Sequence, residues 1–428
     1  MKILIVSNSP WRNDNSFGNS FSNIFEGIQD LEIANVYCKY GFPENNVASH
    51  FFQIAEKSII SNLLKGTPSG KNRCRKNKMQ ESDDGETSFN KIKRYKNLAM
   101  YWARAAIWKT GRWKSQELIE FLDDFKPDLL FIPIYHSYYL HDINRFVLER
   151  YGIPAVGYVS DDVYTLKQFS LSPLYWLDKI IIRPTMRRVF SWCKVVYVIS
   201  EVQKREYTAL FGDKFKLLTK CKDFSDANRP AFKDTNGVIR LLYAGNISKG
   251  RLYILKRLAQ AISHINADNQ KMKLDIYSST PLKESDKRKL MIENCCEIHP
   301  PVSYDKVMKL IEESDVLIHA EAFSLKESLA VHQSFSTKIV DYVAANRCIF
   351  AIGSERCASI QYFKEHRCGF IAERPDQILT CLETMLKHPE KFREMADCAW
   401  NTGKFCHDKE AMQSMLHNDL IRVLEMAD

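Results

Sequence analysis

Two series of short apolar runs, each alternating with segments of helical periodicity, constrain the fold of this 428-residue chain most strongly. The first series predicts strands at 3–6, 129–132, 155–159 and 195–199. The second predicts strands at 239–244, 273–277, 296–298, 316–319 and 348–352. Short apolar strands that alternate with helices are typical of parallel sheets covered by helices on both faces. We therefore expect an α/β protein with two Rossmann-like domains.

The joint between the two series falls in the polar segment 214–236, which contains an Arg-Pro pair. This position predicts an N-terminal domain at 1–213 and a C-terminal domain at 214–404. The remaining residues, 405–428, have the periodicity of a helix.

The net charge of +9 is concentrated in one segment. Residues 65–114 carry 14 Lys or Arg and four Asp or Glu, a net of +10, which leaves −1 for the rest of the chain (9 − 10). Within this segment, 65–90 has few apolar residues to bury and is expected to form a surface insertion, first basic and then acidic.

The residues that follow, 91–114, predict a basic, Trp-rich amphipathic helix. One interpretation is an interfacial anchor on an anionic membrane surface. The other is a domain helix with a solvated basic face, and the residues do not decide between them. Nucleic-acid binding is not expected, because no nucleic-acid module accompanies the charge.

Composition excludes several other classes. No apolar stretch approaches the roughly 20 residues that span a bilayer, and the N-terminus is a strand-like run rather than a signal peptide. The 12 cysteines have no zinc-type spacing and no C-x-x-C pair. We therefore expect a cytoplasmic protein with free thiols and no metal site.

A phosphate-binding turn is predicted within the segment 333–342, between the last two predicted strands. Its apolar residues recur at helical spacing, so Ser336, Thr337 and Lys338 fall on the first turn of a buried helix. A helix start offers unpaired N–H groups, and Lys338 adds a full positive charge. We predict that this turn binds a nucleoside diphosphate. An ordinary strand–helix–strand unit is the alternative.

A second cation-bearing loop, GNISKGR at 245–251, joins the strand at 239–244 to a helix predicted at 252–262. Asn246, Lys249 and Arg251 are its candidate donor-binding side chains. Either cation could meet a phosphate, and the sequence does not decide between them. Two such loops at strand ends of one domain indicate a phosphate site more strongly than either alone.

The segment 333–342 resembles the donor-binding signature of the retaining GT-B glycosyltransferases of family 4. In that family, two acidic residues separated by seven others flank a Gly-Phe-Gly turn. Here the frame holds Gln333, then Ser-Phe-Ser, then Asp341, so the spacing matches while both end residues differ. The resemblance implies that Asp341 binds the ribose hydroxyls and that Gln333 lies at the transferred sugar, where the family has a charge.

The same resemblance implies roles for four more residues. Lys249 or Arg251 would neutralise the donor diphosphate, and the backbone at Val302, ahead of a helix predicted at 305–314, would contact the base. Gly18 would face the diphosphate at the start of the first helix. His136, after the strand at 129–132, would lie near the donor sugar.

The implied activity is transfer of a sugar from a nucleotide-sugar to a hydroxyl of a glycan or lipid-linked oligosaccharide, by a retaining hexosyltransferase of surface-polysaccharide synthesis. Lys338, with Lys249 or Arg251, would replace the metal used by other transferases, so no metal or cofactor is expected. The GT-B fold also implies that part of the C-terminal helical stretch returns to the N-terminal domain. A lipid-linked acceptor would suit a peripheral location on the inner face of the plasma membrane.

Two other functions remain open at this point. A nucleotide-sugar epimerase uses the same two-domain fold but needs an acid/base set around the sugar. A catalytically silent nucleotide-binding protein would explain why both signature positions depart from the family.

Overall fold

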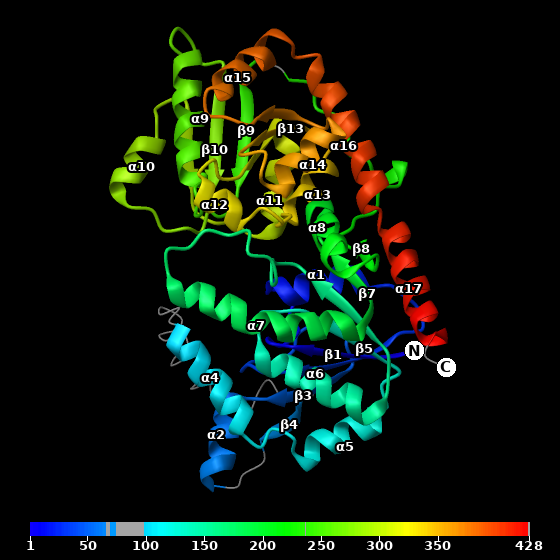
Figure 1. The fold of residues 1–428 in the computed structure, drawn as a ribbon. Helices are drawn as coiled ribbons and strands as arrows, with labels where there is room; N and C mark the ends of the chain where they lie inside the picture. The colour runs from blue at the N-terminus through cyan, green and yellow to red at the C-terminus, as the bar shows by residue number, and fades with distance from the viewer. Residues whose placement is uncertain (66–68, 74–97, 236, 427–428) are drawn as a thin grey trace.

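Two α/β domains, each built on one sheet, form the computed structural model of this chain (Figure 1). It describes residues 1–65, 69–73, 98–235 and 237–426. Most of the predicted insertion at 65–90 and the first part of the predicted helix at 91–114 lie outside these residues. No helix within the described ranges combines the length and the apolar character needed to cross a bilayer.

The N-terminal sheet has the order β4-β3-β2-β1-β5-β6-β7-β8. All neighbours are parallel except β3 and β4, which pair antiparallel at the edge. Its strands are β1 (Lys2–Ser7), β2 (Glu32–Tyr37), β3 (His50–Ile54), β4 (Gly70–Arg73), β5 (Leu129–Pro133), β6 (Ala155–Val159), β7 (Cys193–Val198) and β8 (Phe215–Leu217). Because β8 pairs with β7, this sheet extends past the predicted boundary at 213.

Seven helices of the N-terminal domain lie within the described residues. They are α1 (Ser16–Phe25), α2 (Glu56–Lys65), α4 (Leu98–Thr110), α5 (Gln116–Phe125), α6 (Tyr138–Tyr151), α7 (Pro173–Trp192) and α8 (Glu201–Phe211). Two apolar clusters pack against this sheet, one containing Leu4 and Val6 and the other Ile3 and Ile5. Successive side chains of β1 therefore point to opposite faces of the sheet, and both faces are buried, as expected for parallel strands between helices.

The C-terminal sheet is parallel throughout, with the order β11-β10-β9-β12-β13-β14. Its strands are β9 (Ile239–Ala244), β10 (Met272–Tyr277), β11 (Cys296–His299), β12 (Val316–Ala320), β13 (Cys348–Ile352) and β14 (Phe370–Ala372). The helices that follow the linker turn η2 (Asp226–Asn228) are α9 (Arg251–Ile265), α10 (Glu284–Leu290), α11 (Tyr304–Glu313), α12 (Leu325–Ala330), α13 (Lys338–Val343), α14 (Ala358–His366), α15 (Gln377–Lys387), α16 (Lys391–His407) and α17 (Lys409–Glu425).

The last two helices divide between the domains (Figure 1). Helix α16 packs on α13 and β13 of the C-terminal domain, whereas α17 packs on α1 of the N-terminal domain. Leu416, Leu420 and Val423 of α17 are buried in the same cluster as Ile3 and Ile5. The chain thus crosses between the domains twice, once at each end of the C-terminal domain.

The two crossing segments lie side by side and are hydrogen-bonded to each other. The backbone N–H of Lys222 donates to the carbonyl of His407 at 3.0 Å, and the N–H of Lys409 donates to the carbonyl of Lys222 at 2.8 Å. These bonds form a parallel bridge between Lys222 and Asp408. We refer to this pair of segments as the crossing ribbon.

Helix α4 contains part of the basic, Trp-rich segment, and its environment is the domain core. Trp108 and Trp113 are buried in the N-terminal cluster, and Trp102 Nε1 donates to Asp178 Oδ1 at 2.9 Å. The rings of Trp108 and Trp113 are therefore not available to a lipid surface. Among the described residues, this favours the interpretation of α4 as a domain helix. The membrane anchor at 91–114 stays a prediction.

We expect Leu416→Ala to destabilise the N-terminal domain by about 2–5 kcal/mol, because it removes a fully buried side chain and leaves a cavity under α17. Asn418→Ala, at an exposed position of the same helix, is the matched control and should change stability by less than about 0.5 kcal/mol. Urea unfolding followed by tryptophan fluorescence measures both. Equal effects of the two variants would show that the α17 contact does not stabilise the domain.

Candidate functional site

The loops at the carboxyl ends of the strands in both domains line a set of adjoining cavities. The largest, about 610 Å³, lies between the domains, and we call it the cleft cavity. A second, of about 320 Å³, lies wholly in the C-terminal domain, and we call it the C-terminal cavity. A third, of about 80 Å³, shares Ala244, Asn246 and Lys338 with the C-terminal cavity. Ligands of parallel α/β domains bind at this edge of the sheet.

The C-terminal cavity has an apolar end and a charged end. Val302, Val307, Met308 and Ile311 supply apolar wall, and Tyr277 adds an aromatic ring. Four residues predicted from the sequence line this cavity: Asn246, Val302, Lys338 and Asp341. An apolar cavity with a few convergent polar groups is typical of a small-ligand site.

Lys338 lies where the C-terminal cavity meets the smallest cavity, so protein surrounds its ammonium group while solvent still reaches it. Its Nζ donates to the carbonyl of Ala244 at 2.6 Å. A Cβ on Gly245 would lie 2.1 Å from this Nζ, so the absence of a side chain there makes room for the lysine. Burial first, and then the nearby Arg251, lower the pKa of Lys338 to about 8.

Of the two cations in the loop 245–251, Arg251 lines the smallest cavity and Lys249 is exposed. Arg251 Nη2 donates to both carboxylate oxygens of Glu321 at 2.8 Å, and its Nε donates to the carbonyl of Ala320 at 3.0 Å. Ser336 lines the same cavity. The structure therefore brings Arg251, Ser336 and Lys338 together, with the carboxylate of Glu321 bonded to the arginine.

Asp341 is buried and bonded to three side chains from outside its own helix. Lys220 Nζ donates to both carboxylate oxygens at 2.9 Å, Lys222 Nζ lies 3.0 Å from Oδ1, and the Tyr304 hydroxyl donates to Oδ1 at 3.0 Å. Both lysines belong to the segment that crosses between the domains. A ribose at Asp341 would therefore share the carboxylate with these partners or displace some of them.

Gln333 is buried against the N-terminal domain rather than in a cavity wall. Its Nε2 donates to Glu206 Oε2 at 2.5 Å, its Oε1 accepts from Gln203 Nε2 at 3.4 Å, and its carbonyl accepts from Ser200 Oγ at 2.7 Å. All three partners lie on or cap α8. The predicted contact of Gln333 with a donor sugar stays a prediction. In this structure the residue joins the two domains.

His136 lines the cleft cavity, and its Nε2 lies 2.8 Å from Asp178 Oδ2. Burial lowers the pKa of His136, although the neighbouring Asp178 carboxylate acts in the opposite direction. A neutral ring that donates from Nε2 to the carboxylate leaves Nδ1 as a hydrogen-bond acceptor.

Gly18 lines none of the described cavities, and the structure gives its lack of a side chain another reason. A Cβ there would lie 2.0 Å from the backbone oxygen of Arg12. Its N–H donates to the capping oxygen of Asn15 at 2.8 Å. Gly18 therefore permits the tight approach of the 12–15 loop to α1, and a contact with a diphosphate stays a prediction.

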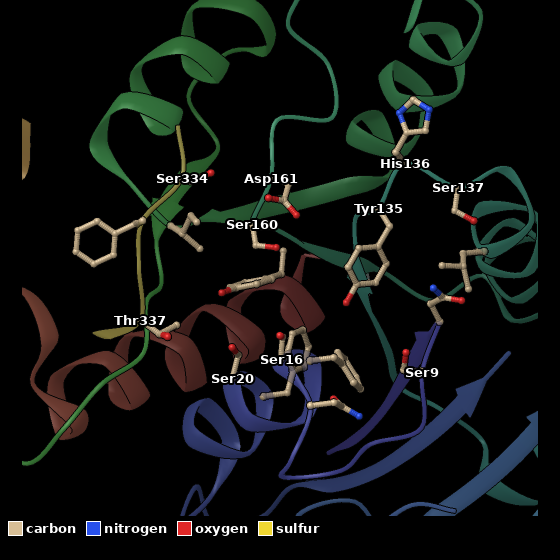
Figure 2. A pocket seen from close by; sticks show the side chains of 18 of the residues that line it. Ser9, Ser16, Ser20, Tyr135, His136, Ser137, Ser160, Asp161, Ser334 and Thr337 are labelled. Carbon is tan, nitrogen blue, oxygen red and sulfur yellow. The ribbon is translucent and has the colours of Figure 1, made fainter. Parts of the chain in front are cut away.

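The cleft cavity is rich in hydroxyl groups, of which only that of Thr337 was predicted as a site group from the sequence (Figure 2). Ser16 and Ser20 of α1 lie on one side, Ser334 and Thr337 of the C-terminal domain on another, and the hydroxyl of Tyr135 points between them. Further polar and aromatic residues of its wall are Asn8, Ser9, Asn15, Tyr101, Ser137, Tyr139, Tyr158, Ser160 and Asp161. Single serines after strands carry little sequence signal, so only the fold shows that they meet.

One group of possible metal ligands occurs among the described residues, on β10 and β11: Asp275, Glu297 and His299. Lys273 Nζ lies 2.8 Å from Glu297 and 3.9 Å from Asp275, so a lysine already supplies positive charge there. The absence of a metal requirement at the cleft stays a prediction.

We expect Gln333→Glu to lower the thermal midpoint of the protein above pH 6, because it places a second carboxylate within hydrogen-bond distance of Glu206. The exchange variant Glu206→Gln/Gln333→Glu restores one amide and one carboxylate and should recover most of the loss. Differential scanning calorimetry at pH 5 and pH 8 measures both. If the single variant is as stable as the wild type at pH 8, the contact does not hold the domains together.

No protein-family model matches the sequence, and no curated protein matches it significantly. Solved structures match over nearly the whole chain. HepE from Anabaena, in complex with UDP and glucose, has a TM-score of 0.60 at 11% identity, over 99% of this chain and 100% of that one. Sucrose-phosphate synthase from Thermosynechococcus elongatus has a TM-score of 0.63 at 9% identity, over 100% of both chains.

The α,α-trehalose 6-phosphate synthase from Burkholderia multivorans is similar in the same way, with a TM-score of 0.59 at 11% identity, over 100% of this chain and 97% of that one. Structural similarity at identities this low establishes the fold alone, so the activity has to be argued from the site. The α/β architecture with two Rossmann-like domains is confirmed, and the chain has the GT-B fold of these glycosyltransferases.

Proposed function

We propose that this protein is a glycosyltransferase that moves a sugar from a nucleotide-sugar, with UDP as the nucleotide, to a hydroxyl of a glycan or lipid-linked oligosaccharide. One observation carries the proposal: a cavity with an apolar end and a cation, Lys338, adjoins a hydroxyl-lined cavity formed by both domains. The choice of UDP is supported by the complexes of HepE with UDP and with UDP-glucose.

The two ends of the C-terminal cavity suit the two parts of a nucleoside diphosphate. The base would lie against the apolar wall at Val302 and Tyr277, and the diphosphate at Lys338 and Arg251. The ribose would lie at Asp341, where Lys220 and Lys222 are now bound. Because both lysines are cations, the diphosphate offers them an alternative partner when the ribose takes the carboxylate.

Transfer would break the bond between the anomeric carbon and the diphosphate oxygen and form a bond from that carbon to the acceptor oxygen. The diphosphate gains negative charge as it leaves, and Lys338 and Arg251 would stabilise this charge more in the transition state than in the ground state. The acceptor proton would pass to the departing diphosphate on the same face of the sugar, with retention of configuration. Two positioned cations would take the place of a metal ion.

The cleft cavity would hold the donor sugar and the acceptor. Its serine, threonine and tyrosine hydroxyls can each donate and accept, which suits the many hydroxyls of a glycan. The free Nδ1 of His136 would accept a hydrogen bond from a sugar hydroxyl. An epimerase would instead need an acid/base pair at the sugar, and Lys338 and Arg251 do not supply one.

A catalytically silent nucleotide-binding protein is the second candidate, because both signature positions have protein partners: Gln333 is bonded to Glu206, and Asp341 to Lys220. Nuclear magnetic resonance of the products from a panel of UDP-sugars and hydroxyl acceptors separates the candidates. A retained anomeric configuration in the product supports the transferase, an isomerised donor without acceptor product supports the epimerase, and UDP binding without turnover supports the silent protein.

Lys338→Met should lower transfer by about a hundred- to a thousandfold, because it removes a cation that meets the leaving diphosphate. It should also abolish the thermal stabilisation by UDP, with or without a chelator. Lys326→Met, at an exposed position of the neighbouring helix α12, is the matched control and should behave as the wild type. Wild-type UDP stabilisation in Lys338→Met would contradict the placement of the diphosphate.

The affinity for UDP should fall as the pH rises above about 8, because the pKa of Lys338 lies near that value and only the protonated form attracts the diphosphate. The expected slope is about tenfold per pH unit until the pKa in the complex is reached. Isothermal titration calorimetry between pH 7 and pH 10 measures it. In Lys338→Arg the group stays charged throughout, so this fall should disappear; a fall that persists would assign the titration to another group.

A further inference from the structure

Exposed apolar side chains gather in one part of this molecule. Of the 17 large hydrophobic residues that are exposed in the described chain, seven lie within residues 166–181: Leu166, Phe169, Leu171, Leu174, Leu177, Ile180 and Ile181. Leu171 is 88% exposed. Single exposed hydrophobic residues are normal, but such a cluster marks an interaction surface.

Helix α7 presents part of this cluster along one face. Leu174, Leu177 and Ile181 are spaced by three and four residues, so they lie on one side of the helix. The opposite side, with Ile182, Met186 and Val189, is buried in the N-terminal core. The one acidic residue of α7, Asp178, is buried and bonded to His136 and Trp102, so no carboxylate interrupts the exposed face.

Basic residues border the apolar face at its carboxyl-terminal end. Arg187 and Arg188 of α7 are exposed. Lys109, Lys114, Arg145 and Arg188 all lie close enough to the Asp142 carboxyl to act on it electrostatically, so these four cations meet between α4, α6 and α7. The carboxylates beside these four cations are Asp142 and Glu149, which lies 3.8 Å from Arg145, so the area keeps an excess of positive charge.

We propose that the exposed face of α7, together with the 166–171 loop, docks onto an anionic membrane surface. The apolar side chains would enter the boundary between headgroups and acyl chains, and the cations around Asp142 would lie at the headgroup phosphates. A second copy of this chain fits the surface less well, because it would present the same apolar and basic face and supply no complementary negative charge to the cations. The borders therefore favour an anionic partner.

This docking deepens the proposed function, on which it rests only for the nature of the acceptor. Helix α7 also reaches the cleft, since its Asp178 holds His136 in the cavity wall. In Figure 1, α7 crosses the N-terminal domain between α6 and the C-terminal domain. A membrane at this face would hold the cleft near the lipid surface, which suits a lipid-linked acceptor. In this proposal α7 makes the membrane contact that the sequence predicted for 91–114, and Lys109 and Lys114 contribute positive charge.

Flotation with vesicles tests the proposal without donor or acceptor. The wild type should float with vesicles of phosphatidylcholine and phosphatidylglycerol, about three to one, and far less with phosphatidylcholine alone. Leu174→Ser/Leu177→Ser/Ile181→Ser should weaken binding at least about tenfold. The control Leu210→Ser/Leu325→Ser/Ile421→Ser removes three exposed apolar residues elsewhere and should float as the wild type. Lys109→Gln/Arg188→Gln should weaken binding to anionic vesicles by about fivefold for each charge.

Thermal stabilisation by UDP checks the fold of each variant and separates this inference from the proposed function. Vesicle binding without any UDP effect would overturn the proposed function and support the docking surface. The docking proposal is overturned if the wild type floats with neither vesicle, or if the α7 triple variant floats as well as the wild type. It is also overturned if sedimentation velocity shows a dimer that the triple variant abolishes while vesicle binding is unchanged.

Discussion

The burial of both faces of two parallel sheets is the constraint on which the rest of this structure depends. Strands such as β6 and β12 have every residue buried, so their polar neighbours in sequence can lie only at the strand ends. In a parallel sheet all carboxyl ends lie along one edge. The loops after β1, β5, β6, β9 and β12 therefore converge, and the cleft cavity lies where the edges of the two domains face each other.

Charged groups in this cleft are held by protein partners. Arg251 is held by Glu321, and Asp341 is held by Lys220. Such pairs keep buried charges from being left unpaired, which would be strongly destabilising. Lys338 differs in that its ammonium group bonds to a neutral carbonyl, and burial, together with the nearby Arg251, lowers its pKa.

The apolar pattern of the sequence predicted most of the strands that are largely apolar or that alternate between apolar and polar residues, and tertiary contacts explain some of those that it did not predict. The predicted strands at 155–159, 239–244 and 348–352 match β6, β9 and β13. Strand β2 was missed, since it contains Asn35, a buried polar residue whose Nδ2 donates to the carbonyl of Ile5 and the hydroxyl of Ser7. In the site, spacing brought Lys338 and Asp341 to one cavity, but no local pattern reveals that Gln333 faces α8 or that distant serines meet.

The crossing ribbon has a mechanical consequence. A single flexible linker would let the two domains swivel and twist freely, whereas two segments hydrogen-bonded to each other resist torsion and bend mainly about one axis. The C-terminal domain would then open and close over the cleft about one axis rather than rotate freely. The side chain of Lys222 in this ribbon lies 3.0 Å from Asp341. A ligand that bonds to this carboxylate would therefore also change a contact of the crossing ribbon.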